Sequence, residues 1–148
     1  NNYTIVQPPD HILVMTEMVH DTRIVRLGEP KPLPADVRPW FGDSWGQRHG
    51  DTLVVETTNF HAIQRAQTGV FAGSSEQLEV TERFTRADET TINYEFTIED
   101  PGTFTRPFSG EMPFKRLPEL VYEYACHEGN YALDNILRGA RAQERGNN

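Results

Sequence analysis

Alternation of apolar and polar residues runs through most of this chain, and it limits the fold more than any other feature. Residues 76–84, EQLEVTERF, place Leu78, Val80 and Phe84 on one face, and residues 91–98, TINYEFTI, alternate in the same way. A period of two is typical of a strand that buries one face, since successive side chains point to opposite sides. The short polar segment between the two stretches predicts a hairpin.

The N-terminal part of the chain shows the same pattern. Residues 3–7, 11–18 and 22–27 predict three consecutive antiparallel strands joined by short links. Residues 28–43 then hold four prolines, which excludes a helix or a central strand and predicts a surface loop. Residues 44–60 return to the alternating pattern and are expected to turn or bend once.

Two more strands and a helix are predicted in the C-terminal part. Residues 104–114 alternate, and residues 120–126, LVYEYAC, read as the last strand. A helix over about 131–144 follows, with Asn130 as its N-cap and with an acidic residue early and arginines late, as the helix dipole favours. Its apolar residues recur at helical spacing: Leu133, Ile136, Leu137 and Ala140.

Eight or nine sequential strands with short links and one terminal helix predict a mainly β fold. The sheet is expected to close on itself, because closure removes unpaired edges. We therefore expect a single antiparallel up-and-down barrel, similar to the lipocalins, with a C-terminal α-helix; a β-sandwich is the alternative. The chain has 148 residues, the length of one domain, so residues 1–148 are expected to form a single β-barrel domain.

Charge and composition argue against several partners. The net charge is −8 and no stretch is rich in lysine and arginine, so binding to nucleic acid is not expected. No apolar run approaches the roughly 20 residues that a membrane-spanning helix needs. The single cysteine allows no disulfide within the chain and argues against a cysteine-rich zinc site.

Catalytic and metal motifs are incomplete in this sequence. Residues 42–46, GDSWG, match the spelling of a nucleophile elbow, but that motif lies between a strand and a helix, whereas a proline-rich loop precedes it in this chain. His127 and Glu128 begin an H-E-x-x-H pattern that ends on Tyr131 instead of histidine. The sequence predicts no metal and no cofactor, although distant histidines that meet in space stay open.

Two charged residues lie on faces that the pattern assigns to the interior. Glu82 shares its face with Val80, and Arg106 shares its face with Phe108. Moving a lone charge out of water costs several kcal/mol, so each residue is expected to have a partner. The alternating pattern calls for apolar residues at these two positions and does not explain why they are charged.

The expected registers bring the two charges together. Placing Glu82 opposite Tyr94, and Ile98 opposite Phe104, sets Arg106 two strands away from Glu82 on the same face. The pair would form the polar floor of an apolar cavity, in which Arg106 binds a ligand oxygen and Glu82 accepts a hydrogen bond or acts as a general base. A structural cluster of the same residues fits the pattern as well. The expected ligand-binding residues are Arg106, Tyr94, Phe84, Phe96, Phe104 and Phe108.

The chain resembles a group of exported proteins that is common among soil bacteria. The matching segments are GDTLVVETTNF at 50–60, RFTRAD at 83–88, YEFTIEDPGTFTRP at 94–107 and YEYACHEGNYALDNILRGARA at 122–142. The resemblance implies a periplasmic or secreted protein, with a leader and a further segment upstream of residue 1. It implies no activity.

Three functions therefore stay open. The first is a barrel that binds a small molecule in its aromatic cavity. The second is an acid/base enzyme on the same barrel, a lyase, isomerase or hydrolase, with Glu82 or His127 as the catalytic group and Arg106 as the stabilising cation. The third is a protein-interaction module that uses the loops 28–41 and 61–75. The sequence identifies neither the ligand nor the oligomeric state.

Overall fold

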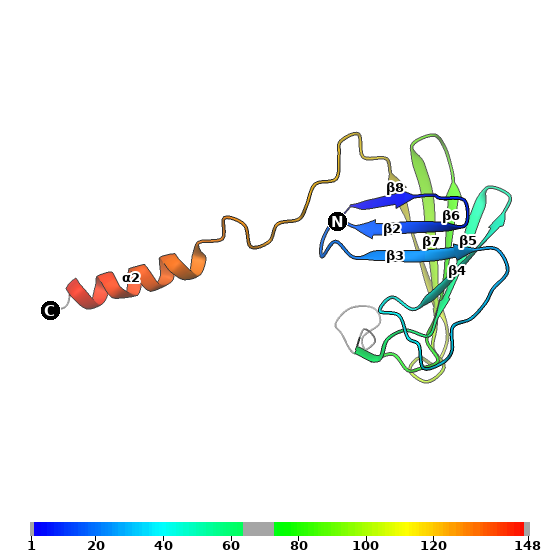
Figure 1. Ribbon diagram of the computed structural model, residues 1–148, viewed down its shortest axis with the longest axis horizontal. Coiled ribbons are helices and arrows are strands. Elements are labelled where there is room, and N and C mark those ends of the chain that lie inside the picture. The colour runs from blue at the N-terminus through cyan, green and yellow to red at the C-terminus, as the bar shows by residue number, and fades with distance from the viewer. Residues whose placement is uncertain (1, 64–72, 147–148) are drawn as a thin grey trace.

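Eight strands form one curled sheet, in which they follow one another in chain order (Figure 1). The computed structural model describes residues 2–63 and 73–146. The mainly β fold and the C-terminal helix that the sequence predicts are thus confirmed. The elements are β1 Tyr3–Val6, β2 His11–Thr16, β3 Thr22–Leu27, β4 Asp43–His49, β5 Thr52–Thr58, β6 Glu79–Arg86, β7 Thr91–Glu99, β8 Phe108–Lys115 and α2 Ala132–Gly146.

The sheet is mixed, so the prediction of a purely antiparallel barrel is wrong. β3 and β4 run parallel, with Val25 beside Ser44, and every other neighbouring pair is antiparallel. The proline-rich residues 28–42 cause this reversal, because they carry the chain back to the end of the sheet where β3 began. Asp43 holds this loop in place by accepting the Leu33 backbone N–H at 2.9 Å and pairing with Arg26.

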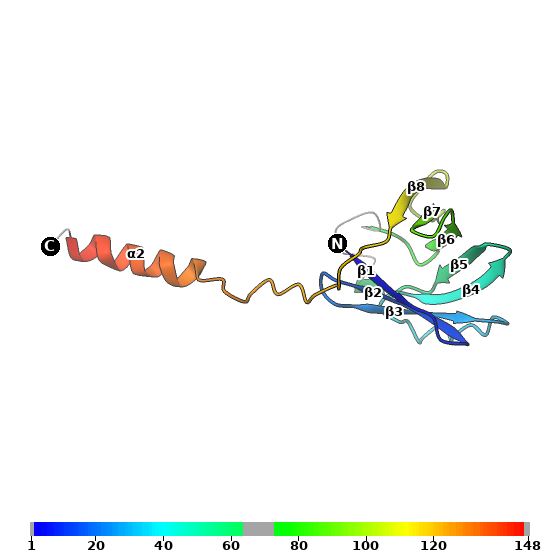
Figure 2. The ribbon, with the colours of Figure 1, turned by 90° about the horizontal axis from the view of Figure 1, so that it is seen from above.

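The curled sheet forms a half-barrel rather than a closed barrel. In the described residues β1 and β8 are its two edges and form no ladder with each other. Seen from above, the sheet wraps around so that the two edges face the same side (Figure 2). We call the opening between them the seam. At one end of the seam the Tyr3 and Phe114 rings stack, with centroids 5.6 Å apart, so an aromatic contact bridges the edges where backbone pairing does not.

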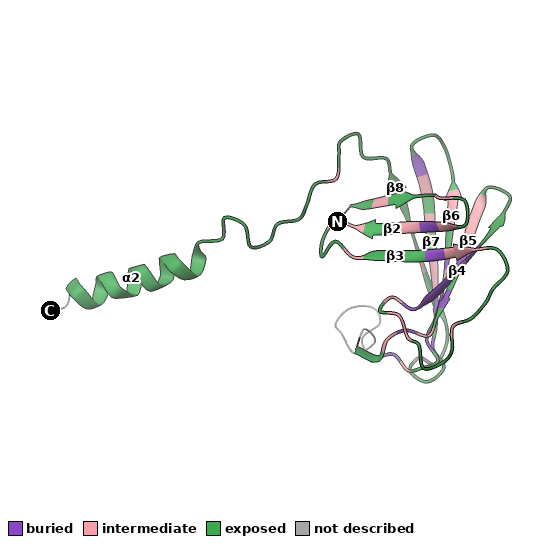
Figure 3. Cartoon of the chain, viewed as in Figure 1, coloured by how far each residue is buried: buried purple, intermediate pink, exposed green. Residues whose placement is uncertain are grey.

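The interior of the half-barrel holds two apolar clusters (Figure 3). Alternate residues of β6 and β7 enter it, as the sequence pattern predicts: Val80 and Ile98 are almost fully buried, as is Leu78 just before β6. Burial of such side chains contributes about 1.5–3 kcal/mol each. One cluster contains Phe60, Leu78, Val80 and Ile98, and the other contains Ile12, Val25 and Val55.

The connection between β7 and β8 is longer than the alternation suggests. Ile98 pairs with Phe108, four residues beyond the Phe104 that the expected register placed there. The cause is the buried Asp100, whose carbonyl accepts the N–H groups of Thr103 and Phe104 and thereby coils the chain before β8 begins. Every residue of 104–107 therefore lies in a loop, and the register of β8 shifts.

The residues after β8 form an arm, residues 116–146, that leads away from the half-barrel (Figures 1 and 2). The strand predicted over 120–126 is wrong, since these residues are in no ladder and all but Val121 are exposed. The predicted helix is confirmed as α2, and Asn130 caps it by accepting the Ala132 N–H at 3.1 Å. No residue of α2 is buried.

Candidate functional site

Glu82 lies inside the half-barrel, as its position in the alternating pattern predicts. Its exposed fraction is 5%, and on β6 it lies beside Val55 of β5 and Phe96 of β7. The expected register, with Glu82 opposite Tyr94, is therefore wrong by two residues, because the β6–β7 loop includes Thr90, which bonds back to Asp88. A carboxylate in such surroundings needs partners to offset the loss of hydration. Two partners are present, and they come from opposite sides of the interior.

Arg23 on β3 is the first partner. Its Nη1 donates to Glu82 Oε2 at 2.6 Å and its Nη2 to Glu82 Oε1 at 3.1 Å, a two-pronged ion pair between strands that are not neighbours in the sheet. The Tyr94 hydroxyl on β7 is the second partner and donates to Glu82 Oε1 at 2.9 Å. We call Arg23, Glu82 and Tyr94 the interior cluster. Planar two-pronged pairing fixes the orientation of both side chains as well as their distance.

The interior cluster keeps the Tyr94 phenol protonated. Burial raises the pKa of Tyr94 well above its ordinary value of 10.0, and the charge of Glu82 and the hydrogen bond to it raise the pKa further. A phenolate at this position would face a carboxylate in a poorly hydrated interior, which is unfavourable. Tyr94 is therefore a fixed hydrogen-bond donor.

A row of stacked rings leads from the interior cluster to the seam. Tyr94 stacks on Phe114 with centroids 4.8 Å apart and planes at 18°, and Phe114 stacks on Tyr3 at 5.6 Å. Phe84 leans against Tyr94 at 5.0 Å. The row thus joins β7, β8 and β1, and the interior cluster holds its inner end.

The seam contains a hollow of about 810 Å³, beside the outer end of this row. Its apolar wall includes Tyr3, Met112 and Phe114. Its charged lining is mixed: Lys115, Arg116 and Arg86 are basic, and Asp88, Glu89 and Glu119 are acidic. Lys115 Nζ donates to Thr91 Oγ1 at 2.7 Å, which holds the ammonium group at the end of β8. We call this space the seam hollow. Its lining comprises Asn2, Tyr3, Thr4, Ile5, Arg86, Asp88, Glu89, Thr90, Thr91, Ile92, Met112, Pro113, Phe114, Lys115, Arg116, Leu117, Glu119, Leu120 and Val121.

Arg106 does not lie in the interior, so its expected position as a cation beside Glu82 is wrong. It is exposed in the loop between β7 and β8, because the coil after Asp100 moves the start of β8 to Phe108. Arg23 takes the place beside Glu82 that the sequence pattern assigned to Arg106.

The remaining predicted lining residues lie toward the other end of the half-barrel. Phe104 packs against the apolar cluster of Ile98 and meets Phe108 edge to face at 5.1 Å, while Phe108 is itself 37% exposed. Phe96 lies between the two ends, with its ring 6.1 Å from that of Tyr94. The predicted aromatic residues thus form two groups, and the group at the seam also contains Tyr3 and Phe114.

His127 is exposed on the arm, together with Cys126. The arm leads away from the sheet, so the structure does not bring His127 together with the buried Glu82 (Figure 1). The two residues predicted as catalytic therefore lie in different parts of the molecule. Acid/base chemistry shared between them has no common site.

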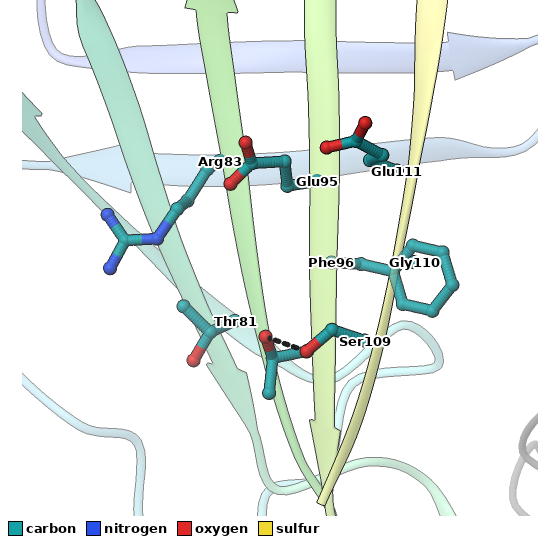
Figure 4. A pocket seen from close by; sticks show the side chains of 8 residues that line it. Thr81, Arg83, Glu95, Phe96, Ser109, Gly110 and Glu111 are labelled. Carbon is teal, nitrogen blue, oxygen red and sulfur yellow. Dashed lines mark hydrogen bonds between the residues drawn. The ribbon is translucent and has the colours of Figure 1, made fainter.

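The outer face of β6, β7 and β8 carries a second, smaller hollow of about 400 Å³ (Figure 4). Glu95 and Glu111 lie directly opposite each other across β7 and β8, and the Arg83 guanidinium is turned away from them. Like charges at such positions repel and favour hydration over burial. This face has the properties of a solvated surface and has no apolar wall like that of the seam hollow.

Arg23 is the functional candidate that the sequence pattern could have revealed. It shares a face with Val25 and Leu27 on β3, so the test that singled out Glu82 applies to it equally. Phe114 is half-buried on β8, whereas Tyr3 is exposed on β1, so burial alone does not single out the two rings. Their contact depends on how the sheet curls, which the pattern does not specify.

Comparison with models of protein families, with curated proteins and with solved structures finds no match for this chain. Within residues 2–63 and 73–146, no helix has the length and apolar character needed to cross a membrane. Over the same residues, no three side chains of histidine, cysteine, aspartate or glutamate gather as metal ligands would.

Proposed function

We propose that this protein binds a small amphipathic molecule in the seam hollow. The observation that carries the proposal is the row of stacked rings, Tyr94, Phe114 and Tyr3, which ends at a hollow of about 810 Å³ and is held from within by a buried ion pair. Ligand sites of small molecules have volumes of about 300–1,000 Å³, apolar walls and a few fixed polar groups. The seam hollow has each of these properties.

We infer a ligand with an aromatic or alicyclic body and an acidic group, which would have to lie on the side of Lys115 and Arg116 and away from Asp88, Glu89 and Glu119. The body would lie against Tyr3, Met112 and Phe114, where apolar surface is exposed to water at present. A carboxylate on the ligand would lie near Lys115 and Arg116 at the end of β8. Burial of apolar area supplies the affinity in such a site, and the cations orient the ligand.

The interior cluster is proposed to position the site rather than to react. Both oxygens of Glu82 already accept hydrogen bonds from Arg23, and one of them also accepts a hydrogen bond from Tyr94. This arrangement holds the Tyr94 ring, which in turn supports Phe114. Binding is thus favoured over the acid/base alternative, because Glu82 is engaged and His127 lies on the arm.

Calorimetric titration with 2-naphthoate, which has an aromatic body and a carboxylate, tests the proposal. Phe114→Ala should weaken binding at least tenfold, since truncation of an aromatic residue at the centre of a site costs more than 1 kcal/mol. Phe108→Ala is the matched control on the same strand and should change the affinity little. Equal effects of the two variants, or no binding by the unaltered protein, would contradict the proposal.

Export from the cytoplasm is part of the proposal and rests on the resemblance of residues 50–60 and 122–142 to exported bacterial proteins. An extracytoplasmic location suits a protein that collects a small molecule from its surroundings. Fractionation of cells that express the full-length gene would test this, with recovery in the cytoplasm as the contrary result.

A further inference from the structure

We propose that the first residues of the arm, 117–121, close over a ligand in the seam hollow and slow its release. We call these residues the strap. Its role depends on the proposed binding function and adds to that function a moving wall, which belongs to neither edge strand of the sheet. The strap residues that line the hollow are Leu117, Glu119, Leu120 and Val121.

The strap lines the seam hollow together with the edge strands. The arm leaves the tip of β8 and passes the start of β1 in both views (Figures 1 and 2). Residues 2–5 at the β1 edge and residues 112–115 of β8 line the same hollow as the strap. The seam hollow therefore has two walls that are held in the sheet and a third wall that is not.

Few contacts hold the strap against the half-barrel. Its near end is fixed, because the Arg116 backbone N–H donates to the Thr90 carbonyl at 2.8 Å. Beyond this bond, in the part of the chain that the structure describes, residues 117–121 belong to no ladder and make no backbone hydrogen bond to the half-barrel. Val121 alone among them is half-buried. A segment with one fixed end and few buried contacts can open and close with a small change in free energy.

The strap carries apolar surface that is exposed to water when no ligand is bound. Leu120 is 76% exposed and Leu117 is 42% exposed, although both line the seam hollow. On the sheet side of the hollow, Tyr3 is 45% exposed and Met112 is 48% exposed. Exposure of apolar side chains around one open space is unfavourable. A ligand with an apolar body would let the strap and the sheet bury these surfaces together.

Charges determine which part of the ligand lies beneath the strap. Glu119 is the one acidic residue of the strap, whereas Lys115 and Arg116 lie at its fixed end. A carboxylate on the ligand is attracted by the two cations and repelled by Glu119. The acidic group would therefore lie at the fixed end, and the apolar body would lie beneath Leu120.

A strap that closes after the ligand has entered acts mainly on dissociation. The open hollow admits the ligand, and contacts with Leu117 and Leu120 form only once the apolar body is in place. Loss of such a contact shortens the time that the ligand stays bound, whereas the association rate changes little. A rigid wall would instead be ordered before binding, so its backbone amides would exchange equally slowly with and without ligand.

Stopped-flow kinetics of the full chain with 2-naphthoate tests the action of the strap on dissociation. Leu120→Ala should raise the dissociation rate about fivefold and change the association rate by less than about twofold, because it removes apolar contact with the bound ligand. Leu120→Met keeps most of this contact and should keep dissociation slow. Leu133→Ala is the matched control: it removes an exposed leucine of the arm that lies outside the lining and should change neither rate.

Amide hydrogen exchange measures the closure itself. At saturating 2-naphthoate, the amides of Leu120 and Val121 should exchange at least about tenfold more slowly than in the free protein, and those of Leu133 and Ile136 should not change. Unchanged dissociation in Leu120→Ala, or equal exchange of the strap with and without ligand, would overturn the strap while binding to Tyr3 and the other rings stands. Failure of the unaltered protein to bind 2-naphthoate would overturn the binding site, and the strap with it.

Discussion

Arg23 and Glu82 form an ion pair across the interior of the half-barrel, between β3 and β6, which two strands separate in the sheet. The pair ties the N-terminal hairpins to the β6–β8 region at a point where no backbone hydrogen bond joins them. Because Tyr94 also donates to Glu82, the same pair fixes the row of rings that leads to the seam. Stability and binding therefore depend on a common set of residues.

Breaking this pair should be costly. Glu82→Gln leaves the Arg23 charge without its partner, and we expect the free energy of unfolding to fall by about 3 kcal/mol, the lower end for buried pairs because Arg23 keeps some contact with water. Urea unfolding measures this change. Combining Glu82→Leu with Arg23→Met should cost less than Glu82→Gln alone, since no charge is then left buried.

Arg83→Met is the matched control for this experiment. Arg83 is the neighbour of Glu82 on β6 but lies exposed on the outer face, so its replacement should change stability by less than about 0.5 kcal/mol. A loss as large as that of Glu82→Gln would show that charge on β6, rather than the interior pair, is responsible.

Tyr94 should make the protein sensitive to alkaline pH. Its pKa is raised in the folded state, so the folded protein holds this proton more tightly than the unfolded chain. The stabilisation is complete below the ordinary pKa of 10.0 and is lost as pH rises above it toward the raised value. Absorbance of phenolate should show a late component in the unaltered protein that Tyr94→Phe lacks. Identical titrations of the two proteins would refute this.

Asp100 should make the stability of the protein sensitive to acid. Burial acts to raise the pKa of Asp100, but hydrogen bonds from Ser75, Thr103 and Gly102 outweigh burial and lower the pKa below 3.8. Its stabilisation is therefore present above that pH and is lost as pH falls through the lowered value. Asp100→Ala leaves the part-buried N–H groups of Ser75 and Gly102 without an acceptor and should cost about 2 kcal/mol at neutral pH. Chemical unfolding at several pH values should show this difference shrinking in acid.

Gly110 is required because of Phe96. A Cβ at position 110 would lie 2.7 and 2.8 Å from two atoms of the Phe96 ring, so Gly110→Ala should destabilise the protein by about 1–3 kcal/mol. Adding Phe96→Leu should recover part of the loss, because the clash is with the ring. Thermal unfolding of both variants checks this. Full additivity of the two substitutions would mean that the ring is not the cause.

Much of the half-barrel could be predicted from the sequence because alternation is a local property. Leu78, Val80, Glu82 and Tyr94 all point inward as predicted, since each strand needs only its own pattern to choose a face. Asn130 likewise marks the start of α2 through a contact two residues away.

The sequence-based predictions fail where a contact between residues far apart in the chain determines the local structure. Asp100 coils the chain through its bonds to Ser75 and to residues 102–104, and this single effect removes Arg106 from the interior. The parallel pairing of β3 with β4 depends on where a long loop returns, which alternation does not encode. The strand predicted over 120–126 has the right pattern but no partner strand in the half-barrel.

Nuclear Overhauser contacts between 2-naphthoate and the half-barrel test the central claim most directly, because they locate the ligand. We predict contacts from the naphthyl protons to the rings of Tyr3 and Phe114 and to the Met112 methyl group, with none to Phe108. Contacts to the outer face near Thr81 and Ser109, or contacts to none of these residues at saturating ligand, would contradict the account.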